Sequence, residues 1–258
     1  MKKKNIAIVT GANSGIGKEF VKLLTLENSI DEIWAIARNE ERLNQLRLEF
    51  GNKIKVFSLD LTNRESLNVI KEELNKDDVN IQYLINNAGF AKFCSYDDIS
   101  LEESLNMIDL NICAVVALVL ICVPYMSNCS HILNIASQAS FQPLPYMNIY
   151  ASTKAFVRNY TRALNIELKE KGITATAVCP GWMKTSLFDR GNIGAKKGVT
   201  NFAFITTPDL VAEKALKDAK NKKDISIYGI YVKSCHLLAK LLPQKIVMQA
   251  WLLQQRNK

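Results

Sequence analysis

The sequence predicts a doubly wound α/β fold built on a parallel sheet. Short apolar runs rich in β-branched residues alternate with amphipathic stretches along the chain, and a glycine-rich turn directly follows the first run. Such alternation is typical of strands joined by crossover helices. Right-handed crossovers place the carboxyl ends of the strands, where ligands bind, on one edge of the sheet.

Seven strands are predicted, with helical patterns between them. The strands are expected at residues 5–10, 32–37, 53–59, 83–86, 131–136, 174–179 and 225–228. The helices are expected at 17–27, 40–50, 64–75, 101–125, 150–171 and 208–221, with Asn39 and Thr62 as N-caps. We expect residues 1–258 to form a single domain, because a chain of this length can bury one large core.

Composition and charge exclude several classes of protein. The chain is 48% apolar and 22% charged, which is ordinary for a soluble globular protein. Its net charge is +8, but the lysines are scattered and the cluster Lys220, Lys222 and Lys223 is interpreted as a solvated loop, so no nucleic acid is expected to bind. Residues 2–4 are interpreted as the start of the first strand rather than of a signal peptide. The apolar run 112–123 is shorter than the ~20 residues that span a bilayer, and it predicts a buried helix.

Cysteine and histidine usage points away from disulfides and metals. The six cysteines form no CxxC pair, which fits a reducing cytoplasm. Only His131 and His236 are available, and neither lies near a carboxylate or cysteine at ligand spacing, so we expect no metal site.

The glycine-rich turn predicts a dinucleotide site. Its spacing is GxxxGxG rather than GxGxxG, but glycine serves the same purpose in both, since it permits a tight turn and lets backbone approach a pyrophosphate at a helix N-terminus. A turn without a ligand is the alternative; the flanking strand and helix favour the binding site. The candidate cofactor contacts here are Thr10, Gly11, Asn13, Ser14, Gly15, Ile16 and Gly17.

The end of the second strand favours NADP over NAD. An acid about 20 residues after the glycines would hold the ribose 2′-hydroxyl of NAD. Ala37 and Arg38 occupy this region instead. A guanidinium suits the 2′-phosphate of NADP, although Arg38 can also be a solvated residue at a helix start.

Tyr150 and Lys154 predict acid–base chemistry. Four residues apart on a helix, they share one face, so an ammonium lies beside a phenol. A phenolate must be stabilised near neutral pH because the pKa of free tyrosine is about 10. Tyr150 can then act as general acid in reduction and general base in oxidation. Ser137 ends the fifth strand and can hold the substrate oxygen as charge develops on it.

These motifs together resemble the short-chain dehydrogenase/reductase family. The resemblance covers most of the chain and implies a Rossmann-type fold and hydride transfer between a nicotinamide cofactor and a carbonyl or alcohol. It adds Asn111 to Ser137, Tyr150 and Lys154 as a catalytic tetrad. Asp60 and Leu61 match the family's adenine contact, Asn86 to Gly89 its NNAG motif, and Pro180 to Thr185 its PGxxxT motif. The implied further cofactor contacts are Asn87, Ala88, Gly89, Tyr150, Lys154, Pro180, Gly181, Met183 and Thr185. The helix after Asn111 resembles the subunit interface of relatives, which implies a homodimer or homotetramer; core packing is the alternative.

Substrate choice is expected to depend on residues 141–147, on 186–204 and on the C-terminal segment. Residues 186–204 contain Arg190, Lys196 and Lys197 with three glycines and are interpreted as a lid. Residues 232–258 form an apolar, amphipathic extension in which Ile246, Val247, Ala250, Trp251 and Leu253 are expected on one face. It can pack as core, line an apolar entrance, or lie on a membrane surface with Lys240, Lys245 and Arg256 outward.

The function predicted from these observations is an NADP-dependent oxidoreductase of hydrophobic secondary alcohols or ketones. Steroid-like (hydroxysteroid) or acyl-chain substrates are hypotheses based on the apolar C-terminus. The alternative from another class is a catalytically idle NADP-binding redox sensor or scaffold, which has no use for a complete tetrad.

Overall fold

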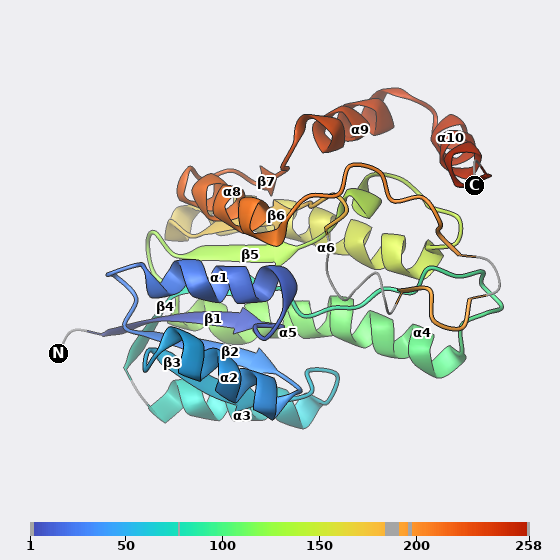
Figure 1. Cartoon of the computed structure of the whole chain (residues 1–258). Helices are drawn as coiled ribbons and strands as arrows, with labels where there is room; N and C mark the ends of the chain where they lie inside the picture. The colour runs from blue at the N-terminus through green and yellow to red at the C-terminus, as the bar shows by residue number, and fades with distance from the viewer. Residues whose placement is uncertain (1–2, 77, 184–190, 196–197, 257–258) are drawn as a thin grey trace.

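A seven-stranded parallel sheet with the order β3-β2-β1-β4-β5-β6-β7 runs through the molecule (Figure 1). The computed structural model describes residues 3–76, 78–183, 191–195 and 198–256. The strands are β1 (Lys4–Thr10), β2 (Glu32–Ala37), β3 (Ile54–Ser58), β4 (Val79–Asn86), β5 (His131–Ile135), β6 (Thr174–Val178) and β7 (Ile225–Ser226). All pairings are parallel, so the predicted doubly wound fold is confirmed. The strand order reverses between β1 and β4, where such folds bind their ligands.

Helices cover both faces of the sheet. One face is covered by α1 (Gly15–Thr25), α2 (Glu40–Phe50) and α8 (Pro208–Lys220), and the other by α3 (Arg64–Lys76), α5 (Ala114–Cys122) and α6 (Asn148–Glu167) (Figure 1). Successive residues of β1 serve the two cores in turn: Ala7 and Val9 pack with the first group of helices, Ile6 and Ile8 with the second. A strand buried on both faces needs apolar residues at every position, which explains its continuous apolar run.

Several element boundaries differ from the predicted ones. β4 begins at Val79, four residues early, because a register shift opposite Ile6 and Ala7 extends its pairing with β1. β7 has only two residues, and Gly229 with φ of +83° redirects the chain soon afterwards. The long helix α6 ends at Glu167 and is followed by a 3₁₀ turn, Lys169–Lys171.

One of the two predicted N-caps is confirmed and the other is wrong. The Asn39 side chain accepts a hydrogen bond from the backbone N–H of Arg42 and caps α2. Thr62 does not cap α3: it donates its backbone N–H and its hydroxyl to the Asp60 carboxylate. The next residue, Asn63, caps the helix instead: its side-chain oxygen accepts a hydrogen bond from the backbone N–H of Glu65 in the first turn.

The predicted helix 101–125 is interrupted near its middle. It consists of α4 (Leu101–Ile108), a π-helical turn at Asp109–Cys113, α5, and a 3₁₀ turn at Val123–Tyr125. Among the described residues this stretch alone is long and apolar enough, by length and composition, to cross a membrane. Leu118 and Cys122 pack in the core, whereas Leu105 and Leu120 are exposed. The apolar run therefore forms a helix that is buried on one side only, not a fully buried one.

The C-terminal extension forms two helices over the carboxyl edge of the sheet. These helices are α9 (Ile230–Leu241) and α10 (Gln244–Arg256), joined at Pro243. They stand away from the helices that cover the sheet (Figure 1). Trp251 is buried, but Leu253 is exposed, so Leu253 does not share its face as predicted.

Candidate active site

The glycine-rich turn joins β1 to α1 at the point where the strand order reverses. Gly11 has φ of +62°, a region that disfavours side chains. A Cβ at Gly17 would lie 2.1 Å from the carbonyl oxygen of Gly11, so only glycine lets the first turn of α1 approach this close. Ser14 precedes α1 without capping it through its side chain, which leaves the first N–H groups of the helix available to an anion. The turn has the backbone shape that a pyrophosphate requires.

Thr10 and Asn87 hold this turn against the end of β4. The Thr10 hydroxyl accepts hydrogen bonds from the backbone N–H groups of Asn87 and Ala88, both at 2.9 Å. The Asn87 amide donates to the carbonyl oxygens of Thr10 and Gly11 at 3.0 and 3.1 Å. Both side chains are therefore used to position the two turns, and a cofactor would be contacted by neighbouring residues instead.

Asn111 connects the end of β4 to α6 from inside the π-helical turn. Its amide group donates to the carbonyl oxygen of Phe90 (3.0 Å) and to the Thr153 hydroxyl (3.1 Å), and its oxygen accepts from the N–H of Phe90 (3.1 Å). A Cβ at Gly89 would lie 2.8 Å from that oxygen. The extra residue of a π turn reorients the side chain it carries, and here that side chain is the fully buried Asn111.

Tyr150 and Lys154 lie on one face of α6, as their spacing predicts. The Lys154 ammonium is 5.9 Å from the centre of the Tyr150 ring and donates to the carbonyl oxygen of Ile135 at 2.7 Å. Burial lowers the pKa of Lys154 to about 8. Burial raises the pKa of Tyr150 to about 12, against the opposing effect of a hydrogen bond with Ser137. Without a ligand, the phenol is therefore a neutral proton donor.

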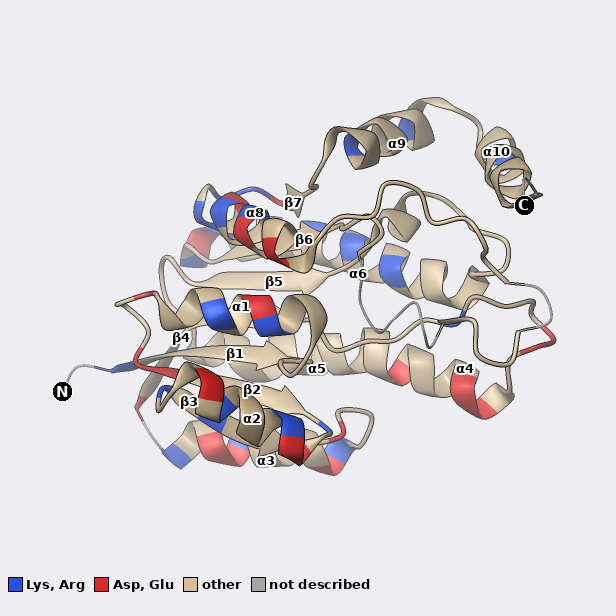
Figure 2. Cartoon of the chain, in the orientation of Figure 1, with Lys and Arg blue, Asp and Glu red and all other residues tan. Residues whose placement is uncertain are grey.

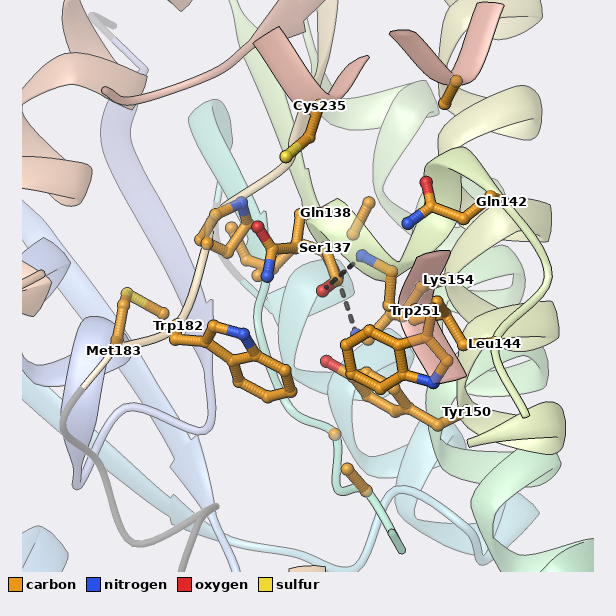
Figure 3. A pocket seen from close by; sticks show the side chains of 18 of the residues that line it. Ser137, Gln138, Gln142, Leu144, Tyr150, Lys154, Trp182, Met183, Cys235 and Trp251 are labelled. Carbon is orange, nitrogen blue, oxygen red and sulfur yellow. Dashed lines mark hydrogen bonds between the residues drawn. The ribbon is translucent and has the colours of Figure 1, made fainter. Parts of the chain in front are cut away.

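Ser137, Tyr150 and Lys154 open into one cavity of about 390 Å³ (Figure 3). Ser137 caps the 3₁₀ turn at Gln138–Phe141, accepting from the N–H of Ala139 at 3.1 Å. In Figure 3, Trp182 lies to the left of this group, and Trp251 belongs to the same apolar cluster as Tyr150. Trp251 donates its indole N–H to the carbonyl oxygen of Pro145 at 3.1 Å, which fixes α10 against the loop before α6.

Many of the predicted site residues line this cavity. They are Gly11, Ser14, Gly15, Ile16, Asn87, Ala88, Gly89, Ser137, Tyr150, Lys154, Pro180, Gly181 and Met183. Thr10, Asn13, Gly17 and Asn111 do not line it, and neither do Arg38, Asp60 and Leu61 at the ends of β2 and β3. Thr185 lies outside the described residues, as does much of the proposed lid at 186–204, including Arg190, Lys196 and Lys197.

Arg38 and Asp60 form an ion pair, with 3.8 Å between the guanidinium and the carboxylate. Burial would raise the pKa of Asp60, but hydrogen bonds from Thr62 and the charge of Arg38 outweigh it and lower that pKa. The two side chains are half exposed, so the pair remains open to a ligand at the sheet edge.

Sequence reasoning missed several residues of the cavity wall. Phe90, Gln138 and Trp182 line it without having been predicted, whereas Gln142 and Leu144 belong to the predicted substrate region 141–147. The side-chain oxygens of Gln138 and Gln142 are buried without a hydrogen-bond partner. In the C-terminal extension, α9 adds Tyr231, Cys235, Leu238 and Ala239, Leu242 follows that helix, and α10 adds Ile246, Val247, Ala250, Trp251 and Gln254. The apolar C-terminal pattern indicated α10, but nothing local marks the glutamines. In the described part of the chain, no cluster of three or more His, Cys, Asp or Glu could hold a metal ion.

Comparison with known proteins identifies the family. The model of the short chain dehydrogenase family matches residues 5–194, so the chain belongs to that family. An uncharacterized oxidoreductase of Staphylococcus epidermidis is 30% identical over 197 residues, which cover 76% of this chain and 85% of that protein.

Solved structures of short-chain dehydrogenases share the architecture. One from Sphingobium yanoikuyae, in complex with NADPH, has a TM-score of 0.78 and 27% identity, covering 94% of this chain and 95% of that chain. The closed form of a serine dehydrogenase with NADP⁺ has a TM-score of 0.76 and 29% identity, covering 86% and 94% of the two chains. The protein is therefore an oxidoreductase of this family, with a fold that accommodates a nucleotide cofactor.

Proposed function

We propose that this protein is an NADP(H)-dependent oxidoreductase that interconverts hydrophobic secondary alcohols and ketones. The observation that carries the proposal is the convergence of Ser137, Tyr150 and Lys154 on a cavity that is apolar on one side and bounded by the glycine turn on the other. When bound, the cofactor supplies or receives the hydride, and the side chains of this chain move the proton.

Tyr150 is the proposed proton donor in reduction and proton acceptor in oxidation. Its neutral phenol, held by burial, donates to the carbonyl oxygen of a ketone. Ser137 shares a hydrogen bond with Tyr150 and donates to the same substrate oxygen as negative charge develops there. The Lys154 ammonium stabilises the phenolate that remains, and Asn111 acts as a positioning residue that holds the end of β4 against α6.

The residues around the turn fit a dinucleotide. Gly11, Ser14, Gly15 and Ile16 present backbone to the pyrophosphate, while Gly17 and Asn87 shape the turn. Ala88, Gly89, Pro180, Gly181 and Met183 line the cavity and would hold the nicotinamide end together with Thr185. Asp60 and Leu61 would contact the adenine, with Thr10 and Asn13 completing the turn.

Arg38 is the basis for proposing NADP rather than NAD. Ala37 at the end of β2 carries no charge that would repel a 2′-phosphate. The Arg38 guanidinium already faces an anion, Asp60, and has donors left over for a second one. Relatives at 27% and 29% identity were solved with NADPH and NADP⁺, which is consistent with this preference.

The walls of the cavity favour an apolar substrate. Leu144, Trp182 and Trp251 surround the catalytic group, and the C-terminal helices add further aliphatic side chains. A volume of about 390 Å³ is within the range of small-molecule sites. Steroid-like and acyl-chain ketones are the substrate classes we propose.

A screen of NADPH oxidation against ketones and aldehydes of increasing chain length tests this function, with NADP⁺-driven alcohol oxidation run alongside. We expect turnover with apolar ketones and none with small polar ones. Binding of NADPH without turnover on any substrate in either direction would favour the alternative, a redox sensor or scaffold. Equal turnover with NADH and NADPH would contradict the cofactor preference and leave the proposed oxidoreductase chemistry in place.

We further propose a single-domain, cytoplasmic protein that assembles as a homodimer or homotetramer. Exposed apolar side chains on α4, α5 and α6, namely Leu105, Leu120 and Phe156, support an interface there. All six cysteines are free thiols, which suits a reducing compartment. Light scattering of wild type and Leu120→Asp tests the assembly, with a loss of the oligomer expected in the variant.

A further inference from the structure

The outer face of α9 is apolar, and none of the residues that the structure describes covers it. Ile230, Leu237 and Leu241 are 83%, 58% and 71% exposed. Their spacing of seven and four residues places them within about 40° of one another around the helix. An exposed row of large aliphatic side chains marks an interaction surface, because water contact with each one is unfavourable.

The same helix has a second apolar face that lines the cavity. Tyr231 and Leu238 belong to it and project at a wide angle from the outer row, and Leu242, directly after the helix, also lines the cavity. Leu238 and Leu242, with Ile246 of α10, are also exposed to solvent. These three side chains therefore form an apolar mouth that joins the cavity to the outside surface.

The charge of this region is of one sign. Asp224 is the last acidic residue, and the chain after it carries Lys233, Lys240, Lys245 and further basic residues but no Asp or Glu. In Figure 2, α9 and α10 accordingly show blue segments and no red ones. Lys233 and Lys240 lie along one flank of the row formed by Ile230, Leu237 and Leu241.

We propose that α9 and α10 dock the protein on the surface of an anionic lipid bilayer. A helix with an aliphatic row flanked by lysines lies in the plane of a membrane, with the row in the acyl boundary and the lysines among the phosphates. A second copy of this chain suits the face poorly, because the twofold contact would bring lysines together with no acid to pair with them. The apolar mouth then opens toward the lipid, from which an apolar substrate enters; this last consequence rests on the proposed function.

Vesicle flotation with the full-length protein tests the docking in the absence of cofactor and substrate. We expect binding to phosphatidylcholine vesicles that contain phosphatidylglycerol, weak binding to pure phosphatidylcholine, and release by high salt. Lys233→Gln with Lys240→Gln should weaken binding roughly thirtyfold, from the contribution of each lysine near an anionic surface. Leu237→Ser with Leu241→Ser should weaken it roughly tenfold.

Matched controls lie outside α9 and α10. Leu26→Ser with Leu48→Ser removes two leucines that are at least as exposed as Leu237 and Leu241, and Lys169→Gln with Lys171→Gln removes two exposed lysines. Both should float like wild type. The proposal is overturned if wild type ignores anionic vesicles, if the controls lose as much binding as the α9 variants, or if Leu237→Ser with Leu241→Ser only dissociates a dimer. Turnover of a soluble ketone, measured separately, should be the same in the α9 variants as in wild type. If wild type itself does not turn over any ketone, the proposed chemistry is contradicted, but the docking proposal is not.

Discussion

Tyr150 and Lys154 both line the cavity, and burial favours the uncharged form of each side chain. The Tyr150 phenol has its pKa raised to about 12, and the Lys154 ammonium has its pKa lowered to about 8. Burying both groups opposes folding, because each loses hydration. Their roles can be separated by substitutions that change one property at a time.

Tyr150→Phe should remove turnover and leave cofactor binding nearly intact. The change deletes the proposed proton donor but keeps the ring, so kcat should fall about 10²- to 10⁴-fold. The Kd for NADPH, measured by calorimetry, should stay within about twofold of wild type. Tyr96→Phe, at an exposed tyrosine, is the control and should behave like wild type. A Tyr150→Phe enzyme with wild-type kcat would refute the acid–base role.

Lys154 should set the pH at which alcohol oxidation begins. Oxidation requires the phenolate of Tyr150, so kcat/KM should rise with pH. An ammonium nearby favours the phenolate and lowers the pKa of the tyrosine. Because the pKa of Lys154 is about 8, the ammonium lowers the pKa of Tyr150 below that pH, and this effect is lost as the pH rises above it.

Lys154→Met should therefore move the midpoint of the oxidation profile to higher pH. Lys154→Arg keeps a permanent positive charge and should leave the midpoint closer to that of wild type. The measurement is kcat/KM for one alcohol from about pH 6 to about pH 10. Superimposable profiles for Lys154→Met and wild type would show that the ammonium has no influence on Tyr150.

At the scale of elements, the ends of β1, β2 and β4 form one ligand-facing edge. The β1–α1 turn is positioned by Thr10 and Asn87, and Arg38 projects from the end of β2 toward Asp60 after β3. Cofactor preference should thus depend on strand ends that are far apart in sequence and adjacent in the sheet.

Arg38→Ala should erase most of the preference for NADPH over NADH. Losing one charge-assisted contact to a phosphate costs about 1.5 to 3 kcal/mol, or roughly tenfold to a hundredfold in affinity. Affinity for NADH should change little, since it lacks the 2′-phosphate. Calorimetric titration of both nucleotides checks this, with Arg42→Ala on the exposed first turn of α2 as the control. Equal binding of both nucleotides by wild type would contradict the preference.

The π turn inside the α4–α5 stretch was not predictable from local pattern. The sequence there predicts one continuous apolar helix. The reason for the extra residue of the π turn is the hydrogen bonding of Asn111 to Phe90 and Thr153, which lie elsewhere in the chain. The Thr62 cap failed for a related reason: the hydroxyl was already bonded to Asp60, a competitor that residue type alone does not reveal.

At the scale of the whole molecule, the C-terminal helices complete a cavity that the sheet alone leaves open. Trp251 packs beside Tyr150 and Leu144 and is held by its bond to Pro145. We therefore expect this apolar cover to favour binding of substrates that bury apolar surface.

Catalytic efficiency should rise with the chain length of a ketone series, and Trp251→Ala should flatten that trend. Each buried CH₂ contributes about 0.8 kcal/mol, or roughly fourfold in kcat/KM. The variant should also unfold at lower urea concentration, because removing a buried tryptophan costs about 3 to 5 kcal/mol. Leu253→Ala, at an exposed position on the same helix, should preserve both properties. A flat chain-length series in wild type would contradict the apolar cover.

The sequence by itself determined the fold class, the strands near the site and several residues that line one cavity, among them Ser137, Tyr150 and Lys154. These features depend on local signals: apolar runs that need burial, glycines where no Cβ fits, and Tyr150 and Lys154 one helical turn apart. The family match over residues 5–194 agrees with that reading.

The tertiary structure alone decided how those residues are used. It engaged the side chains of Thr10 and Asn87 in holding the turn, brought Arg38 to Asp60, and placed Gln138 and Gln142 beside the cavity. It also left one side of α9 uncovered by the described residues. The physical reason is that hydrogen-bond partners and burial are set by segments distant in sequence, which compete for the same donors, acceptors and apolar surface.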